Sequence, residues 1–453
     1  MTTYLDDKNA NKKKLFKEII LFALPIMATS VLQILYNAAD TIIVGKFDSY
    51  QAMAAVGSVS SIVNIVTTFF GCLSVGVLSV TARAIGQKDR DFSFKVVHTS
   101  IALGIMGGVF FGALGFFISG PMLVLMETPS TIFSMANTYL KLYFLGVPFT
   151  MLYGFASSLL KANGDTKRPL VILAISGLVN VILNCIFVIC FDLGVVGVAV
   201  ATVISQMIST VAVMVLLCKE KEYTKFFVKK IKIHIDALKE ILRIGVPVGL
   251  QSLSFTLASS IMQRYVNLFG DIVIAGKVAA TSIESFLIVI MSAIGQTTLV
   301  FTSKSFGEKD LDKIKLIFKQ TLLFGIIVSF LMCLIILSLS KQFLSLYNDN
   351  PDVIEAGKLY LLFLAPCYLL VAITEPCSNS VRGMGYSTLP MVTTLIGICG
   401  VRTLWLIIGF LIIQNIYILY AAFPISCVVT AVIHFISYLC IKEKVKNRFE
   451  KEE

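Results

Sequence analysis

The sequence predicts an all-α integral membrane protein, with twelve transmembrane helices in two six-helix lobes that are related by an internal parallel repeat. Three observations support this fold class: the hydropathy of the chain, the distribution of its basic residues and the recurrence of short motifs. Hydrophobic residues occupy 57% of the 453 positions, and charged residues only 14%. This composition is too apolar for the surface of a water-soluble protein, so lipid is the expected solvent.

Apolar stretches recur along the chain and are separated by short charged loops. A hydrocarbon layer of ~30 Å requires about 20 helical residues, and these stretches are long enough to cross it. The first is longer than a signal-peptide core and is not followed by a small-x-small pattern, so we expect it to remain in the mature protein. The expected spans are residues 18–43, 52–80, 94–119, 134–159, 169–191, 195–217, 240–263, 277–302, 316–340, 357–380, 388–412 and 416–441.

Basic residues are distributed unevenly between the two sides of the membrane. When successive spans alternate in direction, 31 of the 38 Lys and Arg residues fall on the side that holds both termini. Because basic residues collect in cytoplasmic loops, we expect both termini to be cytoplasmic and the chain to span the plasma membrane. The net charge of +11 is spread over these loops instead of forming one stripe with aromatic residues, so no nucleic-acid partner is expected.

Three motifs recur at a nearly constant spacing of 221 or 222 residues. A repeat of six helices keeps both copies in the same direction across the membrane, so the copies are parallel repeats. The motif pairs are residues 18–25 (EIILFALP) and 240–247 (EILRIGVP), residues 86–89 (GQKD) and 307–310 (GEKD), and residues 161–164 (KANG) and 382–385 (RGMG).

The repeat divides the chain into five parts. A basic stretch joins the two lobes and is interpreted as a cytoplasmic linker, with two readings open: a short amphipathic helix on the membrane surface, or a solvated charged face. The parts are a cytoplasmic segment at 1–17, an N-terminal lobe at 18–217 with helices 1–6, the linker at 218–239, a C-terminal lobe at 240–441 with helices 7–12, and a cytoplasmic tail at 442–453.

Asp40 is the most informative residue of the first lobe. A carboxylate inside a membrane helix costs ~2.5 to 3.5 kcal/mol and therefore favours a polar cavity, a proton or a cation. Helical spacing places Tyr36 and Asn37 on the same side of the helix as Asp40. The other reading is that Asp40, near the outer end of its span, simply reaches interfacial water.

The second lobe contains its own charged residues within spans, Glu284, Glu375 and Arg402, and a polar Gln251. The three charges can neutralise one another as a buried structural ion pair, or they can form a second coupling site.

The ten cysteines lie mostly within spans and include no C-x-x-C pair, so neither a disulfide framework nor a metal site is expected. No catalytic constellation and no nucleotide-binding loop is present, so the chain is not expected to be an enzyme.

The order and spacing of several motifs resemble the multidrug and toxic compound extrusion (MATE) family. The resemblance implies a V-shaped pair of lobes and export driven by a proton or sodium gradient. The motifs that carry it are PIMATSVLQILYNAADTIIVG at 25–45, AAVG at 54–57, the repeated loops at 86–89 and 307–310, GDTKRP at 164–169 and RGMGYS at 382–387.

In that family, positions that match Asn180, Asn184 and Thr202 form a polar cluster with Asp40. Family members often carry a second Asp at the position of Asn184. Two carboxylates suit Na⁺, whereas one carboxylate with amide neighbours gives a weaker metal site and is also compatible with a single proton. The asparagines have a structural alternative, because hydrogen bonds between membrane helices contribute ~0.6 kcal/mol without any function. Pro25 is a candidate hinge, since prolines within spans permit kinks.

We therefore expect a secondary active antiporter that exports small drug-like compounds, cationic or amphipathic, in exchange for H⁺ or Na⁺. We expect a monomer in the bilayer, with no cofactor beyond the coupling ion and no metal beyond Na⁺ at Asp40. The alternative is a flippase for lipid-linked saccharide or peptidoglycan precursors. Such a protein needs several cations to hold a diphosphate, and Arg402 is the only Lys or Arg deep in a span, which argues against it.

Overall fold

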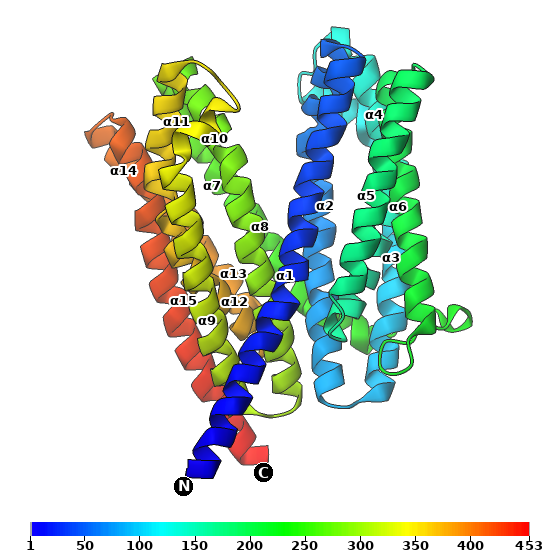
Figure 1. Cartoon of the computed structure of the whole chain (residues 1–453), viewed down its shortest axis with the longest axis vertical. Coiled ribbons are helices and arrows are strands. Elements are labelled where there is room, and N and C mark those ends of the chain that lie inside the picture. Colours follow the sequence, from blue (N-terminus) through cyan, green and yellow to red (C-terminus); the bar gives the residue numbers. More distant parts are fainter. Residues whose placement is uncertain (1, 453) are drawn as a thin grey trace. The chain divides into compact units, whose positions relative to one another are not determined.

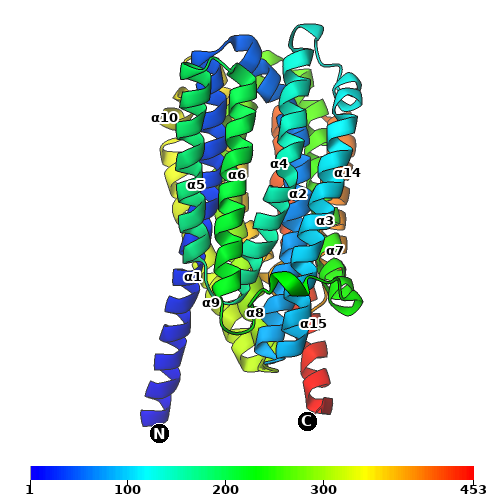
Figure 2. The same ribbon diagram turned by 90° about the vertical axis from the view of Figure 1, so that its right-hand side faces the viewer.

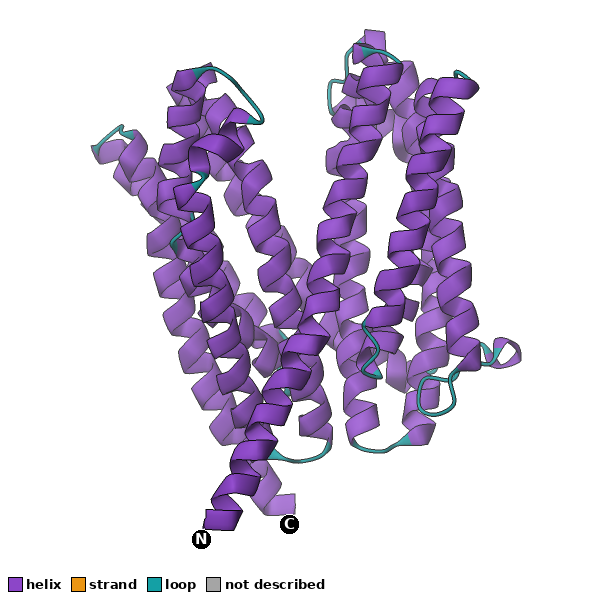
Figure 3. Cartoon of the chain, in the orientation of Figure 1, coloured by secondary structure: helices purple, strands orange, loops and turns teal. Residues whose placement is uncertain are grey.

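The computed structural model of the protein describes residues 2–452, and every regular element in that range is a helix (Figures 1 and 3). The long helices are α1 (Thr2–Phe47), α2 (Tyr50–Gly86), α3 (Arg90–Leu125), α4 (Ser130–Ala162), α5 (Lys167–Cys185), α6 (Gly194–Lys219), α7 (Ile235–Val266), α8 (Asp271–Gly307), α9 (Leu311–Ser338) and α15 (Ile416–Glu452). The shorter helices are α10 (Ser340–Ser345), α11 (Pro351–Leu364), α12 (Cys367–Gly383), α13 (Thr388–Thr394) and α14 (Arg402–Ile412).

Eleven helical stretches of the described chain are long and apolar enough to cross a membrane, and a bent pair forms the twelfth. The pair consists of α11 and α12, which meet at an angle of 43°. Pro366 lies between them and cannot donate a backbone hydrogen bond, so the helix is interrupted at this point. The prediction of twelve transmembrane helices is confirmed, and the tenth span is a broken helix.

Two spans that the sequence predicted as regular helices contain π-helical segments. In the fifth span, α5 continues into η1 (Ile186–Cys190), and in the eleventh, η4 (Leu395–Val401) joins α13 to α14. A π-helical turn holds an extra residue and changes the direction of the side chains that follow it. In η4, Gly397 packs so closely against Thr430 of α15 that a side chain at position 397 would collide with it.

The repeated G-x-K-D motif folds into the same turn in both halves. Asp89 accepts a hydrogen bond of 2.8 Å from the backbone N–H of Phe92 and begins α3, and Asp310 does the same at the start of α9. The preceding lysine in each copy has a left-handed backbone, with φ of 57° at Lys88 and 56° at Lys309. The sequence repeat is therefore a repeat of helix-capping geometry.

The chain folds into two compact units, one formed by residues 28–245 and the other by residues 1–27 and 246–453. These bounds differ from the expected lobes at 18–217 and 240–441, because α1 and α7 each contribute to both units. The backbone carbonyl of Lys12 in α1 accepts a 2.7 Å hydrogen bond from Gln320 of α9. At the start of α7, Glu240 forms an ion pair of 2.5 Å with Arg83 of α2.

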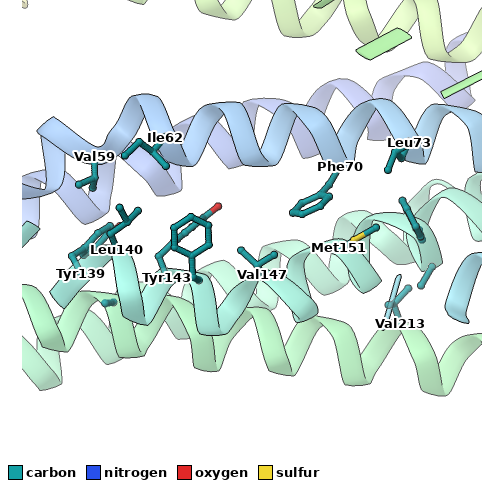
Figure 4. Close-up of a cluster of buried hydrophobic side chains, with 14 of the residues drawn as sticks. Val59, Ile62, Phe70, Leu73, Tyr139, Leu140, Tyr143, Val147, Met151 and Val213 are labelled. Carbon is teal, nitrogen blue, oxygen red and sulfur yellow. The ribbon is translucent and has the colours of Figure 1, made fainter. Parts of the chain in front are cut away.

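Within residues 28–245, α4 packs against α2, α3 and α6. Figure 4 shows Ile62 and Phe70 of α2 facing Tyr143 and Met151 of α4, and these side chains belong to one buried apolar cluster. Glycines spaced along α3 allow α4 to approach closely, since a Cβ at Gly108 would lie 2.6 Å from the Cα of Pro148. Figure 2 shows α5 and α6 side by side, and these two helices position the polar cluster described below.

The basic linker between α6 and α7 contains one helical turn, the 3-10 segment η2 (Val228–Lys230). It is attached to α3 at its middle and at its end, because the backbone N–H of Phe227 donates to Nε2 of His98 at 3.2 Å and that of His234 donates to the hydroxyl of Thr99 at 2.9 Å. The reading of this linker as an amphipathic helix is therefore wrong. Hydrogen bonds to α3 hold it in place instead.

Candidate functional site

A polar cluster lies among α1, α5 and α6, within residues 28–245. Oδ1 of Asp40 accepts a hydrogen bond of 2.6 Å from Nδ2 of Asn184, and Oδ2 lies 3.4 Å from the hydroxyl of Thr202. Nδ2 of Asn184 also donates to Oδ1 of Asn180 at 3.2 Å, and Nδ2 of Asn180 donates to Thr202 at 3.4 Å. The structure thus brings together the four residues that the resemblance implied.

Three of these four side chains are buried, and Thr202 is half-buried. Asp40 is 9% exposed, Asn180 5% and Asn184 0%. No Lys, Arg or His forms an ion pair with Asp40 in the described part of the chain. A carboxylate in this setting is balanced only by neutral donors, so a proton or a small cation would complete its charge.

Tyr36 and Asn37 were predicted on the same side of the helix as Asp40, and the structure separates them. The hydroxyl of Tyr36 donates to the backbone carbonyl of Ala174 in α5 at 3.1 Å, and its ring covers Gly177, so this residue fixes α1 against α5. Asn37 is exposed, and its side chain makes no hydrogen bond to the cluster. Helical spacing alone could not distinguish these two outcomes.

The second unit places its charged residues around a cavity of about 480 Å³ that lies wholly within residues 246–453. All four candidates from the sequence, Gln251, Glu284, Glu375 and Arg402, line this cavity. The sequence allowed the three charged residues to form one ion pair, and the structure shows that they do not. Each of the three side chains instead forms hydrogen bonds with neutral partners of its own.

Glu284 of α8 is held by two tyrosines of the bent tenth span. Oε2 accepts a hydrogen bond from the hydroxyl of Tyr360 in α11, and Oε1 accepts one from Tyr368 in α12, each at 3.1 Å. The two tyrosines lie on either side of the break at Pro366. One carboxylate therefore connects both segments of the broken helix to α8.

A chain of polar side chains connects Glu375 to α7. Oε2 of Glu375 accepts a 2.8 Å hydrogen bond from Asn379, and the amide oxygen of Asn379 accepts one of 3.1 Å from Nη1 of Arg382. Nη2 of Arg382 donates to the side-chain oxygen of Gln251. This chain gives Gln251 and Glu375 a shared neighbour, Arg382, that the sequence had assigned to a cytoplasmic loop.

Arg402 begins α14, directly after the π-helical η4. It is 7% exposed, and its Nε donates to the hydroxyl of Ser426 at 3.0 Å. Its guanidinium lies 4.8 Å from the ring centroid of Phe423. Lys277, which the sequence reading had left at the edge of the membrane, is 8% exposed and lines the same cavity.

The residues that sequence reasoning missed are the partners: Lys277, Tyr360, Tyr368, Asn379 and Arg382. Two of them carried a signal, because Tyr360 and Tyr368 lie in one apolar span two turns apart, a spacing that places them on similar faces. The hinge candidate Pro25 lies inside an unbroken α1, two residues before the boundary between the units.

The two polar sites are not copies of each other, since Glu284 and Glu375 lie on α8 and α12 and the first cluster lies on α1, α5 and α6. At a spacing of 222 residues Asp40 corresponds to Met262, and at a spacing of 221 residues Asn184 corresponds to Trp405. Ionisable residues inside membrane helices mark substrate and ion pathways. Twelve membrane helices in parallel repeats, each half with an ionisable site of its own, define a polytopic membrane transporter.

Comparison with known families identifies the particular kind of transporter. The MatE family profile matches the sequence twice, over residues 25–186 and 247–408, so the chain belongs to this family of membrane transporters and is not an enzyme. The two matches confirm the internal repeat. They also confirm the resemblance that the motifs indicated.

Curated relatives cover most of the chain. The chain is similar to the probable multidrug resistance protein YpnP of Bacillus subtilis, with 27% identity over 84% of this chain and 85% of that protein. It shares 27% identity with the probable multidrug resistance protein NorM of Thermotoga maritima, over 85% and 84% of the two chains. The multidrug export protein MepA of Staphylococcus aureus is 23% identical over 92% and 90%.

Solved structures agree in fold. A MATE protein in its bent conformation superimposes with a TM-score of 0.90 at 21% identity, over 96% of this chain and 97% of that one. The outward-facing conformation of a multidrug resistance MATE family transporter of the MOP superfamily gives 0.89 at 21% identity, over 95% and 96%.

Proposed function

We propose that this protein is a secondary active antiporter that exports small drug-like organic compounds in exchange for an inward-moving cation, which is H⁺ or Na⁺. It acts as a monomer in the plasma membrane, with both termini in the cytoplasm. The names of its relatives support the substrate class, since YpnP, NorM and MepA are all described as multidrug resistance or export proteins.

The observation that carries the proposal is the buried Asp40 with neutral partners only. A side chain that binds a proton or cation in one conformation and releases it in another is what couples an ion gradient to transport. Asn184 and Thr202 connect Asp40 to α5 and α6, so a change in its charge alters the hydrogen bonds that hold three helices together.

Two features of the cluster favour a proton as the coupling ion. The hydroxyl of Thr202 donates to the backbone carbonyl of Val198 at 2.9 Å, so its remaining contact with Asp40 suits a protonated carboxyl that donates to the hydroxyl oxygen. Asn184 also replaces the second carboxylate that Na⁺ would favour. Na⁺ remains the alternative, with carboxylate, amide and hydroxyl oxygens as its ligands.

Inside-out membrane vesicles test the proposal. A pH gradient with an acidic lumen and a Na⁺ gradient with a Na⁺-rich lumen are imposed separately, and accumulation of ethidium in the lumen is followed by fluorescence. We expect the pH gradient alone to drive uphill accumulation, and nigericin to abolish it. Accumulation driven only by the Na⁺ gradient would identify sodium as the coupling ion, and accumulation driven by neither would refute antiport of either ion.

A further inference from the structure

We propose that the cavity within residues 246–453 is a binding site for the carboxylate of an apolar organic compound, with Arg402 as the residue that binds the carboxylate. This inference deepens the proposed function, on which it rests, by naming a chemical class of substrate. It concerns the unit that does not contain Asp40. Four features of the cavity support it: hydrogen-bond donors without a partner, an excess of positive charge, an apolar wall and a volume that suits a drug-sized molecule.

Arg402 has hydrogen-bonding capacity that the protein does not use. Its Nε is bonded to Ser426, and the ring of Phe423 supports the guanidinium, while Nη1 and Nη2 make no hydrogen bond in the described structure. Two parallel N–H donors are the geometry that binds a carboxylate through both of its oxygens. A guanidinium buried inside a membrane lobe with these donors unfilled is costly unless a ligand completes it.

Lys277 adds a second cation with spare donors. Its Nζ donates one hydrogen bond, of 2.5 Å, to the side-chain oxygen of Gln263, and an ammonium group has three donors. Lys277 and Glu284 are seven residues apart in α8, which places them on the same face of the helix. The wall of the cavity therefore carries two cations, Lys277 and Arg402, together with the carboxylate of Glu284.

The charges of the cavity leave an excess of positive charge. The two oxygens of Glu284 are occupied by Tyr360 and Tyr368, and Glu375 is connected through Asn379 to Arg382, a cation of its own. The charges of Glu375 and Arg382 cancel each other. Two cations, Lys277 and Arg402, then remain with the single carboxylate of Glu284. One negative charge on a ligand would restore neutrality.

The remaining surface is suited to an apolar body. Phe255, Met262, Ile288 and Met291 line the cavity, and Met side chains adapt to ligands of different shape. A volume of about 480 Å³ accommodates a drug-sized molecule, and ligand pockets commonly measure ~300 to 1,000 Å³. A lipid-linked diphosphate carries more negative charge than one arginine and one lysine can neutralise, and it is too bulky for this volume. We therefore assign the anionic group to a carboxylate.

Direct binding to the full-length protein in phosphatidylcholine nanodiscs tests the assignment without any ion gradient. The probes are 4-phenylbutyrate, its uncharged amide and 4-phenylbutyl phosphate, titrated by calorimetry. Trp405 is the only tryptophan of the chain and lies three residues after Arg402, so its fluorescence provides a second readout. We expect the carboxylate to bind about tenfold more tightly than the amide, because only the carboxylate forms charge-assisted hydrogen bonds.

Arg402→Gln should remove this preference by weakening carboxylate binding about tenfold while leaving amide binding nearly unchanged. Arg264→Gln is the matched control, because Arg264 is exposed and outside the cavity, and it should bind all probes like the wild type. Equal binding of carboxylate and amide, or an unchanged preference in Arg402→Gln, would overturn the proposal. Tighter binding of the phosphate would overturn the assignment to a carboxylate and indicate a lipid headgroup.

If Arg402→Gln does not fold, Lys277→Gln and Arg402→Lys replace it. Each should reduce the preference for the carboxylate, since the first removes a cation and the second replaces paired donors by one ammonium group. A preference that both variants retain would reject the site. Asp40→Asn should bind the probes like the wild type even when it no longer couples to a gradient, so failure of this inference is distinguishable from failure of antiport.

Discussion

Asp40 and Asn184 are 144 residues apart in the sequence, and Nδ2 of Asn184 donates a hydrogen bond of 2.6 Å to Oδ1 of Asp40. Both side chains are buried, and the amide oxygen of Asn184 has no hydrogen-bond partner among the described residues. An amide that only donates to the carboxylate stabilises the ionised form of Asp40. Rotation of the amide would present its oxygen to the protonated form, so Asn184 can serve both states of the site.

Asp40→Asn should abolish gradient-driven transport. The substitution keeps the size of the side chain but removes the group that binds the coupling ion. Without that group the ion no longer favours one conformation over the other, so the ion gradient cannot drive the conformational change. The measurement is substrate accumulation in inside-out vesicles, compared with vesicles that lack the protein. Asp48→Asn, at an exposed position beyond the end of the same helix, should transport normally. Transport by Asp40→Asn at the wild-type rate would contradict the mechanism.

Asn184→Asp should create a sodium site. It places a second carboxylate beside the first, and two like charges at this separation need a cation between them. We expect NaCl to stabilise the variant by about 1 kcal/mol or more relative to KCl, through binding to the folded state, while the wild type shows no such difference. Thermal unfolding of both proteins in the two salts is the measurement. Identical unfolding of the variant in NaCl and KCl would count against this account.

Gly177→Ala should destabilise the protein by roughly 1 to 3 kcal/mol. The added methyl group would collide with the ring of Tyr36, displace it and break its hydrogen bond to Ala174. Gly57→Ala is the control, because a Cβ there meets no atom within 4 Å and alanine favours a helix. Thermal unfolding followed by size-exclusion chromatography compares the two, and equal stability would show that Tyr36 moves aside without cost.

Exchange of charges should identify the ion pair that holds α7 on the first unit. Arg83→Glu and Glu240→Arg should each destabilise the protein, because each places like charges where the structure has opposite charges 2.5 Å apart. The double variant should recover stability, with a coupling of about 0.5 to 3 kcal/mol. Unfolding of the four proteins gives this coupling directly. Additive effects of the two substitutions would mean that the pair does not hold these helices together.

The spans and turns could be predicted because their causes are local in the sequence. Apolar length defines a membrane helix, and Asp89 and Asp310 begin their helices with side chains three residues from the N–H groups that they accept. The break at Pro366 is a local effect too. The π-helical turn before Arg402 has no such marker in the sequence, and within it Gly397 packs closely against Thr430 of α15.

The contacts inside the sites depend on how neighbouring helices are rotated, and hydropathy does not specify rotation. The resemblance to the family placed Asn180, Asn184 and Thr202 beside Asp40, whereas spacing alone added Asn37, which is exposed. In the second unit nothing local connected Glu284 with Tyr360 and Tyr368, which follow it by 76 and 84 residues.

The boundaries within α1 and α7 have a consequence for how such a chain could arise. Each half of the sequence begins with a segment that packs in the unit formed mainly by the other half: residues 12–27 in one direction and residues 235–245 in the other. A domain-swapped dimer of six-helix subunits would have the same arrangement if its two chains were joined end to end. A polypeptide cut in the linker would therefore yield two fragments that each lack part of their own unit, and neither would fold completely without the other.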